Sequence, residues 1–201
     1  MSISAIVLAG GESRRLGTKK HLLQFGGQTL LQIIVDRLSQ VSDDIIIVTS
    51  PRDEAELGVS GARVIADGIP GRGPLSGLHA GLQAATSDRA LLVAVDMPFL
   101  SVPLLRHLSQ LEPNADAVVP EVAGNVEPLL AVYARTCLPA VEDLLTRDGA
   151  SMRDLLQRMD TYLVPEAEIR SFDPSGLSWF NLNTPEDVDR ARAIWEEGAA
   201  L

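Results

Sequence analysis

Short apolar runs alternate along the first half of the chain with segments whose apolar positions follow helical spacing. Strands are expected at the apolar runs, which span residues 3–9, 44–49, 63–66 and 90–95. Helices are expected between them, at residues 29–41, 52–57 and 75–85. Strands that are apolar throughout are typical of a parallel sheet covered on both faces. The pattern therefore predicts an α/β fold with a mostly parallel sheet.

The second half of the chain is less regular. Strands are expected at residues 117–119 and 129–133, and helices at residues 138–145 and 151–158. The last helix has a clear start at Thr184-Pro185-Glu186-Asp187, with a hydroxyl N-cap, a proline in the first helical position and acids in the first turn. No internal repeat, low-complexity linker or domain boundary interrupts the pattern, so one domain is expected.

The composition is ordinary for a globular protein, since 46% of the 201 residues are apolar and 22% are charged. A formal net charge of −10 argues against non-specific nucleic-acid binding, which needs a broad basic face. The single cysteine, Cys137, excludes an internal disulfide framework and a cysteine-rich metal site. Neither a signal-peptide pattern nor a membrane-length apolar stretch is found, so a cytoplasmic protein without membrane contact is expected.

The first strand ends in Gly10-Gly11, and a cluster of cations follows: Arg14, Arg15, Lys19 and Lys20. Glycines let backbone amides approach a ligand, and clustered cations bind negative oxygens. Open α/β sheets bind ligands at the carboxyl ends of their strands, where this loop is expected to lie. The glycine spacing fits neither the dinucleotide fingerprint nor the P-loop. The loop is therefore interpreted as another kind of nucleotide-phosphate site.

Asp96 follows the apolar run 90–95 directly and is expected at the same edge of the sheet. Mg²⁺ commonly takes one or two carboxylates together with phosphate oxygens and water. A single aspartate is thus enough for a metal that arrives with its nucleotide. The alternative is an aspartate that caps a helix near residues 102–108.

Three further segments carry polar groups near predicted strand ends. The glycine-rich stretch 67–78 places Asp67 where it could accept hydrogen bonds from a ribose or a base. Near the C-terminus, alternation is expected to put the amides of Asn181 and Asn183 on one side of a strand, suited to a heterocycle. Turn and cap chemistry is the alternative for this pair. Glu127 is expected to face either the site or solvent.

Four segments in this order resemble the MobA-type molybdenum cofactor guanylyltransferases. They are residues 8–11 with Arg15, Gly17 and Lys20, and the stretches 73–78, 95–98 and 181–187. The resemblance covers nearly the whole length. It implies a single three-layer α/β/α domain over residues 1–201, with a Rossmann-like, mostly parallel mixed sheet. GTP and Mg²⁺ would then bind to the N-terminal half and molybdopterin to the C-terminal half.

The resemblance also implies roles for particular residues. Those implied at the nucleotide are Leu8, Ala9, Gly10, Gly11, Gly17, Lys20, Asp67, Gly77 and Asp96. Those implied in catalysis are Arg15, Lys20 and Asp96, with Asp96 also the Mg²⁺ ligand. The residues implied on the pterin side are Asn181 and Asn183. The stretch from Gly17 to Lys20 is one residue shorter than a common family form, so Lys19 could share the role of Lys20.

The activity implied is transfer of GMP from GTP to molybdenum-loaded molybdopterin, with release of pyrophosphate. Molybdoenzyme apo-proteins and other cofactor-biosynthesis proteins are the implied protein partners. Two rivals share the fold: a cytidylyltransferase for the same pterin and a sugar-phosphate nucleotidyltransferase. The Leu-Ala-Gly-Gly form of residues 8–11 favours guanine over cytosine. A third rival is a non-catalytic protein that binds or carries the pterin cofactor.

Overall fold

The computed structural model describes residues 2–10, 19–53, 57–69 and 71–198. Its main sheet has the strand order β10-β7-β9-β6-β1-β4-β5, and β8 pairs with β7. The strands are β1 (Ser4–Leu8), β4 (Asp44–Thr49), β5 (Arg63–Ala66), β6 (Arg89–Ala94), β7 (Ala117–Val122), β8 (Asn125–Val126), β9 (Leu130–Ala134) and β10 (Thr161–Val164). A separate two-stranded hairpin joins β2 (Gln24–Phe25) to β3 (Gln28–Thr29).

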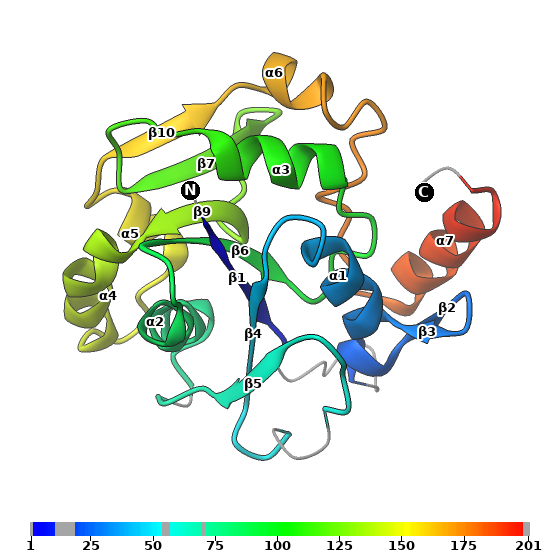
Figure 1. Cartoon of the computed structure of the whole chain (residues 1–201), viewed down its shortest axis with the longest axis horizontal. Coiled ribbons are helices and arrows are strands. Elements are labelled where there is room, and N and C mark those ends of the chain that lie inside the picture. The colour runs from blue at the N-terminus through cyan, green and yellow to red at the C-terminus, as the bar shows by residue number, and fades with distance from the viewer. Residues whose placement is uncertain (1, 11–18, 54–56, 70, 199–201) are drawn as a thin grey trace.

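The sheet is mostly parallel. Strand β1 pairs in parallel with both β4 and β6, β4 with β5, and β10 with β7. Strand β9 is antiparallel to both of its neighbours, β6 and β7. Strand β9 therefore begins at the edge where β1, β4 and β6 end. These carboxyl ends point downward in Figure 1.

Helices cover both faces of the sheet (Figure 1). One face carries α1 (Leu30–Leu38), α3 (Val102–Gln110), α6 (Glu166–Arg170) and α7 (Pro185–Glu196), and the other carries α2 (Pro74–Ala84), α4 (Leu138–Leu145) and α5 (Met152–Leu156). Single 3-10 turns occur at Lys20–Leu22 and Arg135–Cys137. The molecule thus has the expected three α/β/α layers.

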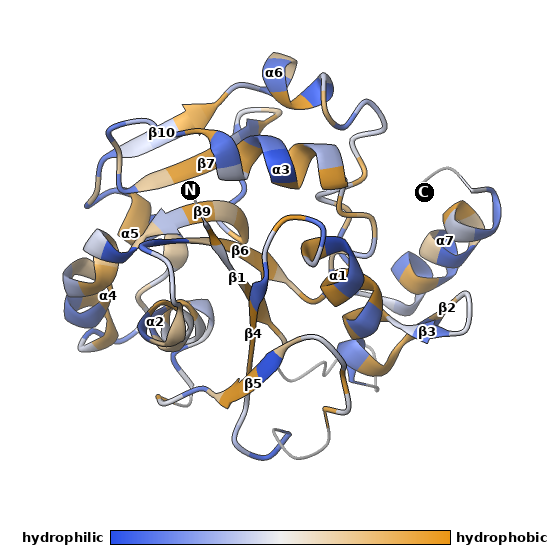
Figure 2. Ribbon diagram, viewed as in Figure 1, coloured by the Kyte–Doolittle hydropathy of each residue, from blue (hydrophilic) through white to orange (hydrophobic). Residues whose placement is uncertain are grey.

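Two apolar cores lie between these layers, and β1 contributes to both. Its residues Ala5 and Val7 pack on the α1 and α3 side, whereas Ile6 and Leu8 pack on the α2 and α4 side. Side chains of a strand alternate between faces, so a strand buried on both faces is mostly apolar. Figure 2 shows this as hydrophobic colour along the central strands, with hydrophilic colour on the outer sides of the helices.

Helix starts follow the local chemistry that the sequence predicts. Thr184 accepts a hydrogen bond from the Asp187 backbone, and the Asp187 side chain returns the contact to the Thr184 backbone. This reciprocal capping box satisfies amides that have no partner within the helix. None of the described residues forms a helix long and apolar enough to cross a membrane.

Several expected elements differ in the structure. Arg52 and Asp53, in the segment expected to be helical, form a turn, because the Asp53 amide donates to the Ser50 carbonyl. Residues 54–56 lie outside the described residues. The strand expected at 117–119 continues to Val122, and the helix expected to reach Arg158 ends at Leu156. The structure adds β8, β10 and α6, which are too short to leave a clear periodic pattern.

Candidate active site

The carboxyl edge of the sheet brings the predicted nucleotide residues together. Backbone hydrogen bonds continue just past the strands: Ala9 donates to Val48, Asp67 to Thr49, and Val95 to Leu8. The N···O distances are 2.8, 2.7 and 3.1 Å, respectively. The loops after β1, β5 and β6 therefore start side by side. This is the edge where open α/β sheets bind ligands.

Gly10 is exposed at this edge, next to the end of β4. A Cβ built on Gly10 would meet its nearest atom, the Ser50 amide nitrogen, at 3.5 Å. That is an ordinary van der Waals distance, so packing within the described protein does not require a glycine here. A ligand approaching the backbone remains a reason for the missing side chain.

Lys20, Asp96 and Asn183 meet although they are far apart in the sequence. The Lys20 Nζ lies 2.7 Å from Asp96 Oδ2 and 3.2 Å from Asn183 Oδ1. The Lys20 and Asp96 side chains are both about one-fifth exposed, at 19% and 20%. One ammonium therefore bridges a carboxylate oxygen and an amide oxygen at the mouth of the site. Oxygens of these two kinds are ligands that Mg²⁺ accepts.

Three separate elements position this group. Lys20 begins the turn Lys20–Leu22, and Asp96 follows β6. Asn183 precedes α7, and its backbone N–H donates to the Asp187 carboxylate of the capping box at 3.0 Å. The Leu182 amide donates to the Asp96 carbonyl at 3.0 Å, which joins the α7 start to the end of β6.

The side chains of Asn181 and Asn183 have different partners in the structure. Residues 181–183 are not a strand, so the expected alternation is wrong for this segment. The Asn181 amide nitrogen donates to the Trp179 carbonyl at 3.1 Å, within its own turn, whereas Asn183 contacts Lys20. The segment is held by a backbone hydrogen bond from Leu182 to Asp96 and not by pairing with a neighbouring strand.

Asp67 forms hydrogen bonds within the loop that follows β5 and with the start of α2. One oxygen, Oδ1, accepts from the Ile69 amide at 3.0 Å and also from the Ser76 hydroxyl at close range. These bonds tie the end of β5 to the first turns of α2. The helix can lie close to β1 because Gly77 has no side chain: a Cβ there would be 2.6 Å from Leu8 Cδ2.

The structure adds an ion pair near this edge, between Lys19 and Asp53, that the sequence did not reveal. The Lys19 Nζ lies 2.7 Å from Asp53 Oδ1, and the Ser50 hydroxyl donates to Asp53 Oδ2 at 2.9 Å. The hydrogen bond from Lys19 holds the pKa of Asp53 below its ordinary value, against a smaller opposing effect of burial. No short-range pattern links positions so far apart in the chain, which is why Asp53 was missed.

Glu127 lies at the same edge, in the turn before β9, where its carbonyl accepts from the Leu130 amide at 3.1 Å. Its side chain is half-buried, and burial raises its pKa, while the charge of Arg153 lowers it. The sequence left open whether Glu127 faces the site or solvent. In the structure its side chain is partly shielded from solvent.

Three predicted residues, Gly11, Arg15 and Gly17, lie outside the described residues, and their roles stay predictions. Among the residues that are described, no group of three or more histidines, cysteines or acids could hold a metal by itself. A divalent cation at Asp96 would therefore need oxygens from a ligand as well.

The fold, and the polar groups at the carboxyl edge of its sheet, are those of an α/β nucleotide-binding class of protein. Proteins of this class bind ligands at the ends of parallel strands. The profile of the MobA-like NTP transferase domain matches residues 5–162. The chain belongs to this family of nucleotidyltransferases.

Relatives and solved structures agree with the family. A protein of Pelotomaculum thermopropionicum named probable molybdenum cofactor guanylyltransferase is 34% identical, over 98% of this chain and 95% of that protein. A molybdenum cofactor guanylyltransferase of Syntrophotalea carbinolica is 36% identical, over 94% of this chain and 90% of that protein. The structure of molybdopterin-guanine dinucleotide biosynthesis protein A from Archaeoglobus fulgidus aligns with a TM-score of 0.85 and 28% identity, covering 97% of this chain and all of the other.

Proposed function

We propose that this protein transfers GMP from GTP to molybdenum-loaded molybdopterin, forming the guanine dinucleotide cofactor and pyrophosphate. The observation that carries the proposal is the convergence of Lys20, Asp96 and Asn183 beside the end of β1. The similarity to proteins named molybdenum cofactor guanylyltransferases, which extends over nearly the full length, supports it. The cytoplasm, where this chemistry would meet its substrates, is the proposed location.

The nucleotide would lie over the ends of β1, β4 and β5. The backbone of Leu8, Ala9 and Gly10 would face guanine and ribose, since Gly10 leaves its outer side open. Gly77 would act indirectly by letting α2 hold Leu8 in place. Asp67 would shape the neighbouring loop and keep its second oxygen, Oδ2, for the nucleotide. Gly11, Gly17 and Arg15 are proposed at the phosphates on the sequence resemblance alone.

Asp96 and Asn183 fit Mg²⁺ because their oxygens already receive a cation, the Lys20 ammonium. When bound, the metal would neutralise charge on the phosphates, and Asp96 would be its protein ligand. Because Lys20 already contacts these oxygens, the described residues offer few free oxygen ligands for a metal. The site therefore suits a metal that is brought by the nucleotide.

The chain's own residues would act by position and charge. Lys20 would leave Asp96 and Asn183 to reach a phosphate oxygen, and Arg15 is proposed to join it. An oxygen of the acceptor phosphate attacks the α-phosphorus in line, and the bond from that phosphorus to the bridging oxygen breaks. Pyrophosphate leaves with the electron pair. The attacking phosphate is already ionised at neutral pH, so no general base is required.

On the acceptor side, the C-terminal half of the chain is proposed to bind molybdopterin. Asn183 would lie at the phosphate end of the acceptor, because it shares Lys20 with Asp96. Asn181, one turn of the loop away, is proposed as a contact farther from the reacting phosphate. Molybdoenzyme apo-proteins and other cofactor-biosynthesis proteins are the proposed recipients of the product.

The direct test incubates the purified protein with GTP, Mg²⁺ and molybdenum-loaded molybdopterin. Mass spectrometry of the pterin product is expected to detect the guanine dinucleotide, with one pyrophosphate released for each product. CTP and UTP in parallel reactions are expected to give little product. Preferential use of CTP would replace the proposal with a cytidylyltransferase, and acceptor binding without any pyrophosphate release would favour a carrier protein.

A further inference from the structure

A cavity of about 450 Å³ opens between the first turn of α2 and the connection from α4 to α5. This volume lies in the range of small-molecule sites. Its apolar floor is formed by Leu75, Leu129, Leu144, Leu145 and Met152. An apolar floor of this size suits a flat ring system better than a triphosphate.

The charged residues that line the cavity have one sign. Arg72, Arg147 and Arg153 line it, and no lining residue is acidic. The whole chain has 27 acids and only 17 lysines and arginines, so this local excess of cations is unusual for the molecule. The cavity therefore favours a ligand that is both aromatic and anionic.

The three arginines differ in how many hydrogen bonds and ion pairs they form within the protein. Arg72 Nη1 donates to the Arg147 carbonyl at 2.9 Å and to Asp148 at 2.8 Å, which ties the two walls together. The Arg147 guanidinium is paired with Asp143 at 2.8 Å. The Arg153 side chain forms no hydrogen bond or ion pair with any residue that the structure describes, and its charge acts on the nearby Glu127 only at longer range. Arg153 thus keeps its donors for a ligand.

The cavity adjoins the reacting edge. The Leu129 carbonyl accepts from the Ala94 amide at 3.1 Å, and Asp96 is two residues farther along the chain. Leu75 precedes Gly77, which packs against Leu8 at the proposed nucleotide site. A ligand in this cavity can therefore present one end to the edge where Lys20 and Asp96 lie.

We propose that this cavity holds the ring system of the acceptor, with the Arg153 guanidinium donating to an anionic group of that acceptor. The assignment rests on the proposed function for the identity of the acceptor. It places the ring on the side of the sheet covered by α2 and α4. The phosphate of the acceptor would extend from there to Asn183.

The test compares the wild-type protein with R153A and R158A. Arg158 is a matched control because it is a nearby arginine that pairs with Asp143 and does not line the cavity. At saturating GTP, R153A is expected to raise the KM for molybdenum-loaded molybdopterin at least about tenfold, the effect of losing a hydrogen bond to a charged group. The GTP dissociation constant, measured by calorimetry, is expected to change less than twofold. R158A is expected to leave both values unchanged.

A second variant, A150F, fills the cavity from a residue that lines it. It is expected to weaken acceptor binding while GTP binding and the cooperative thermal transition are retained. An unchanged acceptor KM in R153A, or an equal loss of GTP affinity, would overturn the inference. So would normal acceptor binding in a folded A150F.

Failure of the proposed function is distinguishable from failure of this inference. Equilibrium dialysis of molybdenum-loaded molybdopterin against the protein needs no turnover. Binding that R153A weakens, in a wild-type protein that releases no pyrophosphate, would reject the transferase and keep the acceptor cavity. Normal turnover by R153A at low acceptor concentration would keep the transferase and reject the acceptor cavity. No acceptor binding by the wild-type protein would reject both.

Discussion

At the scale of single residues, Lys20 is the most informative side chain, because it holds two oxygens that a divalent cation would share. Its ammonium lies 2.7 Å from Asp96 and 3.2 Å from Asn183. A lysine in this position would repel a metal from Asp96 until a phosphate drew the lysine away. Metal binding is therefore expected to depend on the nucleotide.

K20A is expected to bind Mn²⁺ more tightly than wild type when no nucleotide is present, by at least about fivefold. Electron paramagnetic resonance of free Mn²⁺ measures this directly. K19A is the matched control, because Lys19 pairs with Asp53 and not with Asp96. Unchanged Mn²⁺ affinity in K20A would mean that Lys20 does not compete for this position.

Asp96 itself is expected to be essential for turnover. D96A should lower the rate of pyrophosphate release at least about 10³-fold, since it removes the carboxylate that would hold Mg²⁺. Circular dichroism should still show a folded protein, because the side chain is partly exposed and no apolar packing is lost. Near-normal pyrophosphate release by D96A would contradict the metal assignment.

At the scale of elements, the contact between α2 and β1 connects packing to the nucleotide site. Two glycines of α2 face β1, and a Cβ on each would be too close to it. At Gly81 the Cβ would meet three Ile6 side-chain atoms at 2.6 to 2.9 Å, deep in the core. At Gly77 it would come closer than 3 Å only to Leu8 Cδ2, the end of a side chain at the proposed site.

G81A is expected to destabilise the protein by about 1–2 kcal/mol, because overpacking costs more than alanine gains in helix propensity. G77A is expected to lose less stability and instead to weaken GTP binding by displacing Leu8. Denaturant unfolding and GTP calorimetry on the two variants separate these effects. Equal stability losses with unchanged GTP binding would show that Gly77 serves packing alone.

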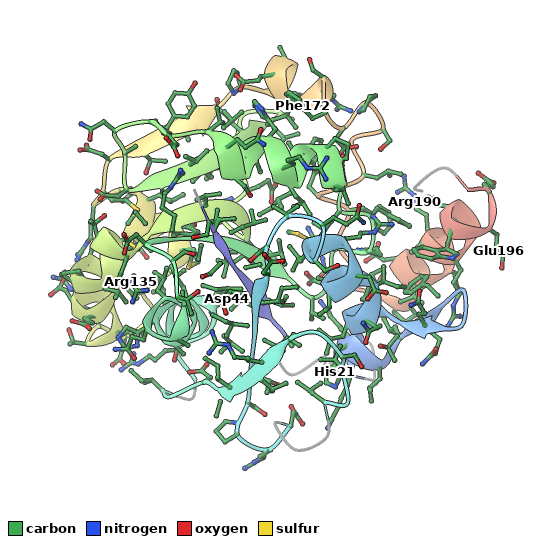
Figure 3. All side chains as sticks on the ribbon, viewed as in Figure 1. His21, Asp44, Arg135, Phe172, Arg190 and Glu196 are labelled. Carbon is green, nitrogen blue, oxygen red and sulfur yellow. The ribbon has the colours of Figure 1, made fainter. Side chains whose placement is uncertain are left out.

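At the scale of the whole molecule, Asp44 joins several elements at the edge opposite the proposed site. Its carboxylate accepts from Ser4 at 2.6 Å, from Arg63 at 2.6 Å and from the Thr86 amide at 2.9 Å. Asp44 is the first residue of β4, and Figure 3 labels it near the centre of the view. Burial alone would raise its pKa, but these hydrogen bonds outweigh burial and hold the pKa well below the ordinary value.

A lowered pKa in the folded state means that Asp44 stabilises the fold above the unfolded-state value of about 3.9. This contribution is lost as the pH falls through the lower, folded-state pKa. D44N is therefore expected to cost about 2 kcal/mol of unfolding free energy at pH 7 and to flatten the loss of stability below about pH 4.

Urea unfolding between pH 2.5 and 7 measures this dependence. D189N is a suitable control, because Asp189 is exposed and, among the described residues, its one ion pair is with Arg192 at 3.8 Å. The kcat of D44N is expected to match wild type, since Asp44 lies at the far edge of the sheet. Parallel pH profiles for wild type and D44N would contradict this role of Asp44.

Much of the fold was predictable from local signals. The buried strands were apolar on both faces, and the α7 start carried its cap within four residues, so pattern and short-range hydrogen bonds decided them. The segment 181–183 misled the prediction because alternation also arises in an extended loop. Its backbone is held by the Asp96 carbonyl, a partner distant in the sequence.

The sequence by itself determined which chemical groups were available and that β1 and β6 would be buried strands followed by polar groups. Tertiary structure alone decided which groups meet: Lys20 with Asp96 and Asn183, Lys19 with Asp53, and Arg153 with an apolar floor. The physical reason is the distance along the chain over which each kind of interaction acts. Propensity, capping and periodicity act over a few residues, whereas strand order and helix packing bring distant residues into contact.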